Sequence, residues 1–141
     1  MKILYICADG IELAGNTAWV AAGDATPPDG GPSGVRLLPY FDAYAVGCHP
    51  RELLFPGRAA ERALSPSGQA GNYPVLLVAG TVAGVWHQRR SGRALDLTVE
   101  PLGRLAAAHR RQLDEQAQRL GGFLEAGPRL TVGTVTAGAH A

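Results

Sequence analysis

Apolar and polar residues alternate most regularly in the middle of the chain. The pattern predicts three closely spaced strands, at Val75–Val78, Val82–Arg89 and Ala94–Val99. The links Ala79-Gly80 and Ser91-Gly92 are short and contain glycine, which is typical of hairpin turns. In the third strand apolar and polar residues alternate, so we expect one face of the sheet to be buried and the other to meet solvent.

The hydrophobic period changes after Pro101. From about Leu105 to Leu124 the chain has no proline and is rich in good helix formers. One face of such a helix is apolar, since it carries Leu113, Ala117, Leu120 and Leu124. Gly127-Pro128 stops the segment, and the pattern therefore predicts one long helix near the C-terminus.

Shorter apolar runs predict the remaining elements. Further strands are expected at residues 2–7, Asn16–Ala21, Val35–Leu38 and Leu130–Val135. Phe41–Val46 is expected to form one or two helical turns that end at Gly47, and His49–Phe55 another short turn.

These elements predict an α+β fold. A curved antiparallel sheet, or a partial barrel, would be covered on one side by the long C-terminal helix. A Pro/Gly-rich loop, Pro27–Gly34, separates the N-terminal strands of residues 1–34 from a C-terminal domain of residues 35–141. We expect both parts to form one compact unit, because 141 residues is the size of a single domain.

The charge of the chain is nearly balanced. A net charge of +1 gives no general attraction to nucleic acid, so any such attraction must come from a local patch. Lys2 is the only lysine and arginine supplies the other positive charges, a bias typical of a GC-rich genome.

Cysteine and histidine indicate no cofactor. Cys7 and Cys48 fit neither a metal motif nor a disulfide framework. The histidines lack ligand spacing, and no glycine-rich phosphate loop is present, so we expect no metal and no cofactor. No apolar run reaches membrane-spanning length, and we expect a cytoplasmic protein without a membrane partner.

The most basic stretch lies at the tip of the predicted ribbon. The candidate DNA-binding residues are His87, Gln88, Arg89, Arg90 and Arg93. Arginine binds phosphate oxygens in pairs and fits a narrow minor groove, so this tip could contact duplex DNA. The alternative is a solvated hairpin whose charges keep the protein soluble.

A second motif begins at the strand Val35–Leu38. A proline ends the strand, and an aromatic-acid pair, a second aromatic, a glycine and an arginine follow. The residues that define the pattern are Pro39, Phe41, Asp42, Gly47 and Arg51, joined farther on by Gly84 and Trp86.

This order of motifs resembles the C-terminal part of the bacterial winged helix DNA-binding domain family, which includes the AlkZ-like and YcaQ-like DNA glycosylases. The resemblance covers roughly residues 16–136. It implies DNA as the partner and a hairpin near the DNA lesion. Members of the family are much longer, with winged helices mostly upstream, so we expect this chain to be a shortened relative that is inactive alone.

Asp42 is open to two interpretations. It could act as a base or substrate contact, or it could cap the helical turn that follows it, and the sequence favours the cap. Arg51 could pair with it. Phe41 and Tyr44 would then pack inward, because they lie three residues apart.

The long helix carries residues that invite a functional interpretation. The resemblance implies a catalytic Gln-X-Gln or Gln-X-Asp motif, but in the N-terminal region of the family. Gln116-Ala117-Gln118 lies in the last helix, so we assign no catalytic residue. The arginines Arg104, Arg110, Arg111 and Arg119 alternate with Asp114 and Glu115, which favours pairing on the helix surface over DNA contact.

Three functions remain in view. The first is a DNA-binding domain that holds duplex DNA through the basic hairpin. The second is an interaction or structural fragment whose protein partner supplies the missing winged-helix half, which predicts an exposed apolar patch. The third is a small enzyme with a pocket beside Asp42.

Overall fold

The structure is a computed structural model that describes residues 8–13, 15–26 and 29–138. The chain divides into two compact units, of which the first ends at Gly31 and the second begins at Pro32. The sequence places this boundary close by, after Gly34. The strand predicted at residues 2–7 lies outside the described residues. The packing of the N-terminal strands into one unit with the rest stays a prediction.

The first unit contains an antiparallel hairpin of β1 (Ala8–Leu13) and β2 (Asn16–Ala21). The prediction of the second strand is confirmed, whereas β1 was not predicted. The carboxylates that break its apolar pattern are satisfied locally. Asp9 accepts a hydrogen bond from the Gly23 N–H at 2.9 Å, and Glu12 accepts one from the Thr17 hydroxyl at 3.0 Å.

The second unit is built on a five-stranded sheet. Its strands, in spatial order, are β3 (Val35–Leu38), β4 (Val75–Val78), β5 (Thr81–Ser91), β6 (Ala94–Pro101) and β7 (Gly127–Val132). The first four are antiparallel, but β6 and β7 are parallel. The long helix α4 (Ala107–Phe123) joins these two strands, and parallel neighbours need such a crossover.

The α+β fold with one long helix on the sheet is therefore confirmed. The sheet is open, with β3 and β7 at its edges. The last strand of the sheet differs from the sequence prediction in its start and its direction. The last strand begins at Gly127 instead of Leu130, and it runs parallel because α4 returns the chain to the end of the sheet at which β6 began.

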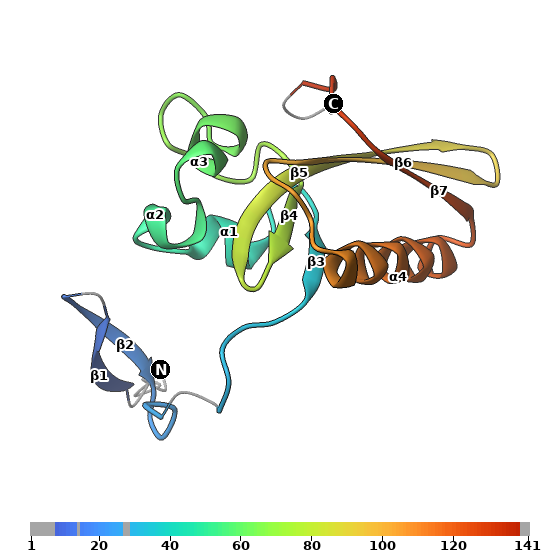
Figure 1. The fold of residues 1–141 in the computed structure, drawn as a ribbon. Helices are drawn as coiled ribbons and strands as arrows, with labels where there is room; N and C mark the ends of the chain where they lie inside the picture. Colours follow the sequence, from blue (N-terminus) through green and yellow to red (C-terminus); the bar gives the residue numbers. More distant parts are fainter. Residues whose placement is uncertain (1–7, 14, 27–28, 139–141) are drawn as a thin grey trace, which may run out of the picture. The chain divides into compact units, whose positions relative to one another are not determined.

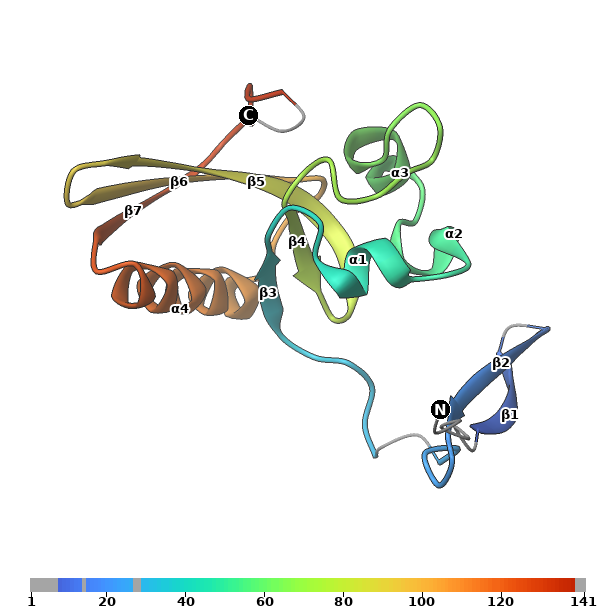
Figure 2. The same cartoon turned by 180° about the vertical axis from the view of Figure 1, so that it is seen from behind.

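Helices cover both faces of the sheet (Figures 1 and 2). Helix α4 packs along one face, where it contacts β3 and β7. The short helices α1 (Ala43–Gly47), α2 (Arg51–Leu54) and α3 (Arg58–Ala63) lie on the other face. The sequence predicts α1 and α2 but not α3. The ribbon of β5 and β6 extends beyond these three helices.

The core on the α4 face is centred on Trp86. Its side chain is 4% exposed and packs in one cluster with Leu76, Leu97 and Leu113. The indole Nε1–H donates to the Leu38 carbonyl at 2.9 Å, so the polar end of the ring is satisfied as well. The prediction that Trp86 is buried on a central strand is confirmed.

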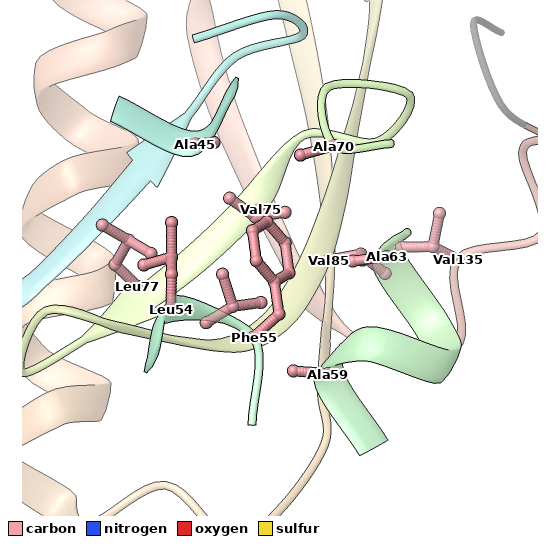
Figure 3. Packing of buried hydrophobic residues seen from close by; sticks show 11 residues of the cluster. Ala45, Leu54, Phe55, Ala59, Ala63, Ala70, Val75, Leu77, Val85 and Val135 are labelled. Atoms are coloured by element: carbon pink, nitrogen blue, oxygen red, sulfur yellow. The ribbon is translucent and has the colours of Figure 1, made fainter. Parts of the chain in front are cut away.

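A second core fills the space between the sheet and the short helices. Figure 3 shows Leu54 and Phe55, at the end of α2, among Val75, Leu77 and Val85 of the strands. The further members Ala45, Ala59, Ala63 and Ala70 are small, which lets the short helices and the loop before β4 approach the sheet closely.

An ion pair between Arg62 and Glu100 links α3 to β6, and both residues also bind the C-terminal segment. The guanidinium donates to both carboxylate oxygens of Glu100 at 3.0 Å. Glu100 also accepts the Val135 N–H, and Arg62 donates to the Val135 carbonyl, both at 2.8 Å. The hydrogen bond from Arg62 lowers the pKa of Glu100 below its usual value, against the opposing effect of burial.

Candidate nucleic-acid interface

The β5–β6 ribbon ends in a two-residue turn, Gly92-Arg93. Gly92 has a φ of 58°, a conformation that glycine adopts without strain. The sequence places the turn one residue earlier, at Ser91-Gly92, and ends the first strand at Arg89. In the structure β5 continues to Ser91, so Arg89 and Arg90 lie on a strand and not in the tip.

The five predicted DNA-binding residues do not share one surface. Side chains alternate between the faces of a strand, so His87 and Arg89 point to one face of the ribbon. Gln88 and Arg90 point to the other, and Arg93 lies in the turn. The sequence predicts one cluster of three arginines at the tip. In the structure Arg89 and Arg90 lie on opposite faces of the ribbon, and Arg93 lies in the turn between the two strands.

The face that carries His87 and Arg89 continues onto β6 and β7. The strand register sets two rows of residues across the three strands, Arg89–Asp96–Arg129 and His87–Thr98–Thr131. We call these six residues the polar face. Most of them line a cavity of about 400 Å³, together with Thr134 and Thr136.

The polar face has a surplus of positive charge. Asp96 accepts a hydrogen bond from the Arg129 Nε–H at 2.8 Å and lies 3.8 Å from an Arg89 nitrogen. One carboxylate therefore stands between two guanidinium groups, which are exposed to 78% and 67%. Guanidinium and hydroxyl groups in this arrangement can donate several hydrogen bonds to phosphate oxygens.

Sequence reasoning missed the contribution of β6 and β7 to this surface. Arg129 and Thr131 occupy every second position of Gly127–Val132, and that alternation predicts a strand with one polar face. The segment was assigned from Leu130 onward, which separated Arg129 from the strand. The crossover through α4 places β7 parallel to β6. The local alternation of residues does not predict this pairing.

The opposite face of the ribbon is more mixed. Arg90 is held near the turn, where its Nε–H donates to the Gly92 carbonyl at 3.2 Å. Gln88 lines a groove between the sheet and α4, together with Trp86. The second glutamine of that groove, Gln116, projects from α4, and its position gives no reason to assign it catalysis.

Asp42 is the N-cap of α1. Its Oδ1 accepts a hydrogen bond from the Tyr44 N–H at 2.9 Å, so the predicted cap is confirmed. The prediction that Phe41 and Tyr44 pack inward is wrong, because they are exposed to 58% and 54%. Ala45 is the residue of α1 that enters the core.

The other residues of this motif fix the backbone around α1. Gly47 is the last residue of the helix. Arg51 was considered as an ionic partner of Asp42, but its guanidinium instead donates to the carbonyls of Ala45 at 2.8 Å and Cys48 at 3.2 Å. Pro39 follows the last residue of β3 and borders the groove between the sheet and α4. Each contact is a backbone support, and none forms a catalytic constellation.

Gly84 is required where β4 and β5 change register. The pairing shifts between Leu76 and Leu77, opposite this glycine. A Cβ at Gly84 would lie 2.5 Å from the Glu100 carbonyl oxygen on the neighbouring strand. The close approach of β6 therefore excludes any side chain at this position.

Metal and membrane features are absent from the described part of the chain. Among residues 8–13, 15–26 and 29–138, no group of three histidine, cysteine or carboxylate side chains could hold a metal ion. No helix within these ranges is long and apolar enough to cross a bilayer.

Fold and surface together define a small α+β domain with helices on both faces of an open sheet and an arginine-bearing ribbon. The sequence model of the family described as DNA glycosylase AlkZ-like matches residues 7–123. The chain belongs to this AlkZ-like family, and the resemblance drawn from its motifs is confirmed.

A solved structure shares the fold. The DNA glycosylase AlkZ of Streptomyces sahachiroi aligns with a TM-score of 0.58 and 23% sequence identity. The alignment covers 88% of this chain and 33% of AlkZ, so the chain spans about a third of that protein's length. A search of the curated proteins found no match.

Proposed function

We propose that this chain is a DNA-contacting domain that holds duplex DNA through the arginines of the β5–β6 ribbon and of the polar face. One observation carries the proposal. Arg89 and Arg129 lie exposed in one row across the sheet, with Arg93 at the adjoining turn. Membership of a family of DNA glycosylases supports DNA as the partner.

The proposed contacts go to the sugar–phosphate backbone. Guanidinium groups and threonine hydroxyls match phosphate oxygens, and contacts of this kind position a protein without reading base sequence. No catalytic residue is assigned to the chain.

The test is a titration of fluorescently labelled duplex DNA at low salt, followed by fluorescence anisotropy. The variant Arg89→Gln/Arg93→Gln/Arg129→Gln is expected to bind more than about tenfold more weakly than the wild-type chain, because three phosphate contacts are lost. Far-ultraviolet circular dichroism checks that the variant is folded.

A matched control removes the same charge elsewhere. Arg104→Gln/Arg110→Gln/Arg111→Gln takes three exposed arginines from α4 and the loop before it. This variant is expected to keep most of its affinity. Equal losses in the two variants would show that total charge, and not the ribbon, attracts DNA.

A second function is favoured by the surface of α1 and α2. Phe41, Tyr44, Val46 and Leu53 are large apolar side chains that remain exposed there. Such a patch is typical of a protein-binding surface. In this function the domain would bind a protein partner, and the remaining part of a longer relative such as AlkZ is the first candidate. Analytical ultracentrifugation with the purified N-terminal part of such a relative tests it, and a stable 1:1 complex is expected.

A further inference from the structure

A groove separates the sheet from the C-terminal half of α4. It has a volume of about 590 Å³ and is bounded by β3, β5 and α4. We call it the α4 groove. It lies on the face of the sheet opposite the polar face, beyond the ribbon residue Gln88.

The charge of the groove selects anions. Arg36 projects from β3 and Arg119 from α4, and no carboxylate is among the residues that line the groove. Arg36 donates one N–H to the Val35 carbonyl at 2.8 Å. A guanidinium has five N–H donors, so both arginines retain donors for a phosphate.

The apolar surface of the groove suits a planar ring. Trp86 and Leu120 form part of its wall. Phe123, at the end of α4, is exposed to 84%. An aromatic ring so placed offers a face on which a nucleobase can stack, and such stacking tolerates every base.

Two amide side chains complete the groove. Gln88 comes from β5 and Gln116 from α4, and both border the same space. Within the described residues, neither side chain makes a hydrogen bond to the protein. An amide both donates and accepts, which matches the polar edge of an unpaired base.

We propose that the α4 groove binds single-stranded DNA, with a base stacked on Phe123 and its phosphate on Arg119 and Arg36. The inference rests on the proposed function and extends it. Duplex DNA would then bind the polar face, and an unpaired nucleotide would bind the α4 groove on the opposite face of the sheet.

Anisotropy titration of the full chain with a fluorescein-labelled octamer of thymidylate tests the proposal. Phe123→Ala is expected to weaken binding by roughly 5- to 150-fold, the range for loss of one stacked base. Arg119→Gln should weaken it further. Leu53→Ala, which removes an exposed apolar side chain outside the groove, and Arg111→Gln, on the exposed face of α4, should bind like the wild-type chain.

The ribbon variant separates the two proposals. Arg89→Gln/Arg93→Gln/Arg129→Gln should lose duplex binding and keep its affinity for the octamer. The groove proposal is overturned if the wild-type chain does not bind the octamer, or if Phe123→Ala and Arg119→Gln bind it as well as the two controls. In that case the groove does not bind single-stranded DNA, and the duplex titration still decides the role of the ribbon by itself.

Discussion

Gly84 shows how one position shapes the sheet. Gly84 does not have a positive φ, so its backbone conformation does not require glycine. Glycine is required because there is no room for a side chain. A Cβ there would meet the Glu100 carbonyl oxygen and the Pro101 Cα at 2.5 Å and 3.1 Å. Backbone atoms cannot move aside as a flexible side chain can. Replacement must therefore push β5 and β6 apart.

We expect Gly84→Ala to lower the free energy of unfolding by roughly 1–3 kcal/mol, the usual cost of overpacking. Urea denaturation measures the change. Gly103→Ala is the matched control, because nothing lies within 4 Å of the added carbon. The control should change stability by less than about 0.5 kcal/mol. Similar losses in both variants would place the constraint outside the β5–β6 contact.

The cap at Asp42 makes a second prediction at this scale. Asparagine can accept the Tyr44 N–H as aspartate does, so Asp42→Asn should leave stability nearly unchanged. Asp42→Ala should cost about 0.5–2 kcal/mol. Thermal unfolding of the two variants measures the difference. If Asp42→Asn costs as much as Asp42→Ala, the charge of the carboxylate is needed and the cap does not explain the residue.

Among the elements, the link between α3, β6 and the C-terminal segment depends on ionisation. As a carboxylate, Glu100 accepts hydrogen bonds through both oxygens, from Arg62 and from the Val135 N–H, and forms an ion pair with Arg62. Its pKa is lowered in the folded protein. The stabilisation is therefore fully present above the usual pKa of a glutamate, about 4.3, and is lost as the pH falls through the lower folded value.

We expect Glu100→Gln to lower the free energy of unfolding at neutral pH by roughly 1–3 kcal/mol, the scale of a lost hydrogen bond to a charged group. The loss should shrink as the pH falls through the lowered pKa of Glu100, because the wild-type side chain then loses its charge as well. Denaturation at a series of pH values measures it. Asp96→Asn, at an exposed pair, should cost less than about 1 kcal/mol. If the loss of unfolding free energy in Glu100→Gln did not change with pH, it would come from altered packing and not from the charge of Glu100.

The elements also show what sequence pattern can predict. The strands β3 to β6 and helix α4 follow from the hydrophobic pattern, because β6 and α4 each present one apolar side to a core and β4 is apolar on both faces. Helix α3 is only six residues long, and its stability comes from Ala59 and Ala63 packing against β5. Alanine at this spacing gives little amphipathic signal, so tertiary contact and not local pattern fixes the helix.

In the candidate site, too, tertiary structure decides what the local sequence pattern leaves open. The arginines of the ribbon are visible in the sequence, yet their distribution over two faces depends on the last residue of β5. One residue of turn placement decides whether Arg89 and Arg90 lie on a strand or in a loop. The rows with Arg129 and Thr131 depend on the parallel return of the chain. Neither feature is encoded in a local pattern.

For the whole molecule, the balance of charge sets the strength of DNA binding. The net charge is +1, so attraction at long range is weak and affinity must come from a few contacts. The ribbon and polar face offer Arg89, Arg93 and Arg129. Arg129 is partly engaged by Asp96, which competes with phosphate for the same guanidinium.

The last prediction follows from this count. Each phosphate contact adds about 0.9 to the steepness of log affinity against log salt on duplex DNA. The slope of Arg89→Gln/Arg93→Gln/Arg129→Gln should therefore be shallower than that of the wild-type chain by roughly 2 to 3. Titrations at salt concentrations from about 20 to about 200 mM measure this slope. Duplexes of different base sequence should bind alike, because the contacts are to phosphate. An unchanged slope would mean that these arginines remain solvated when DNA binds, and that the DNA contacts lie elsewhere on the chain.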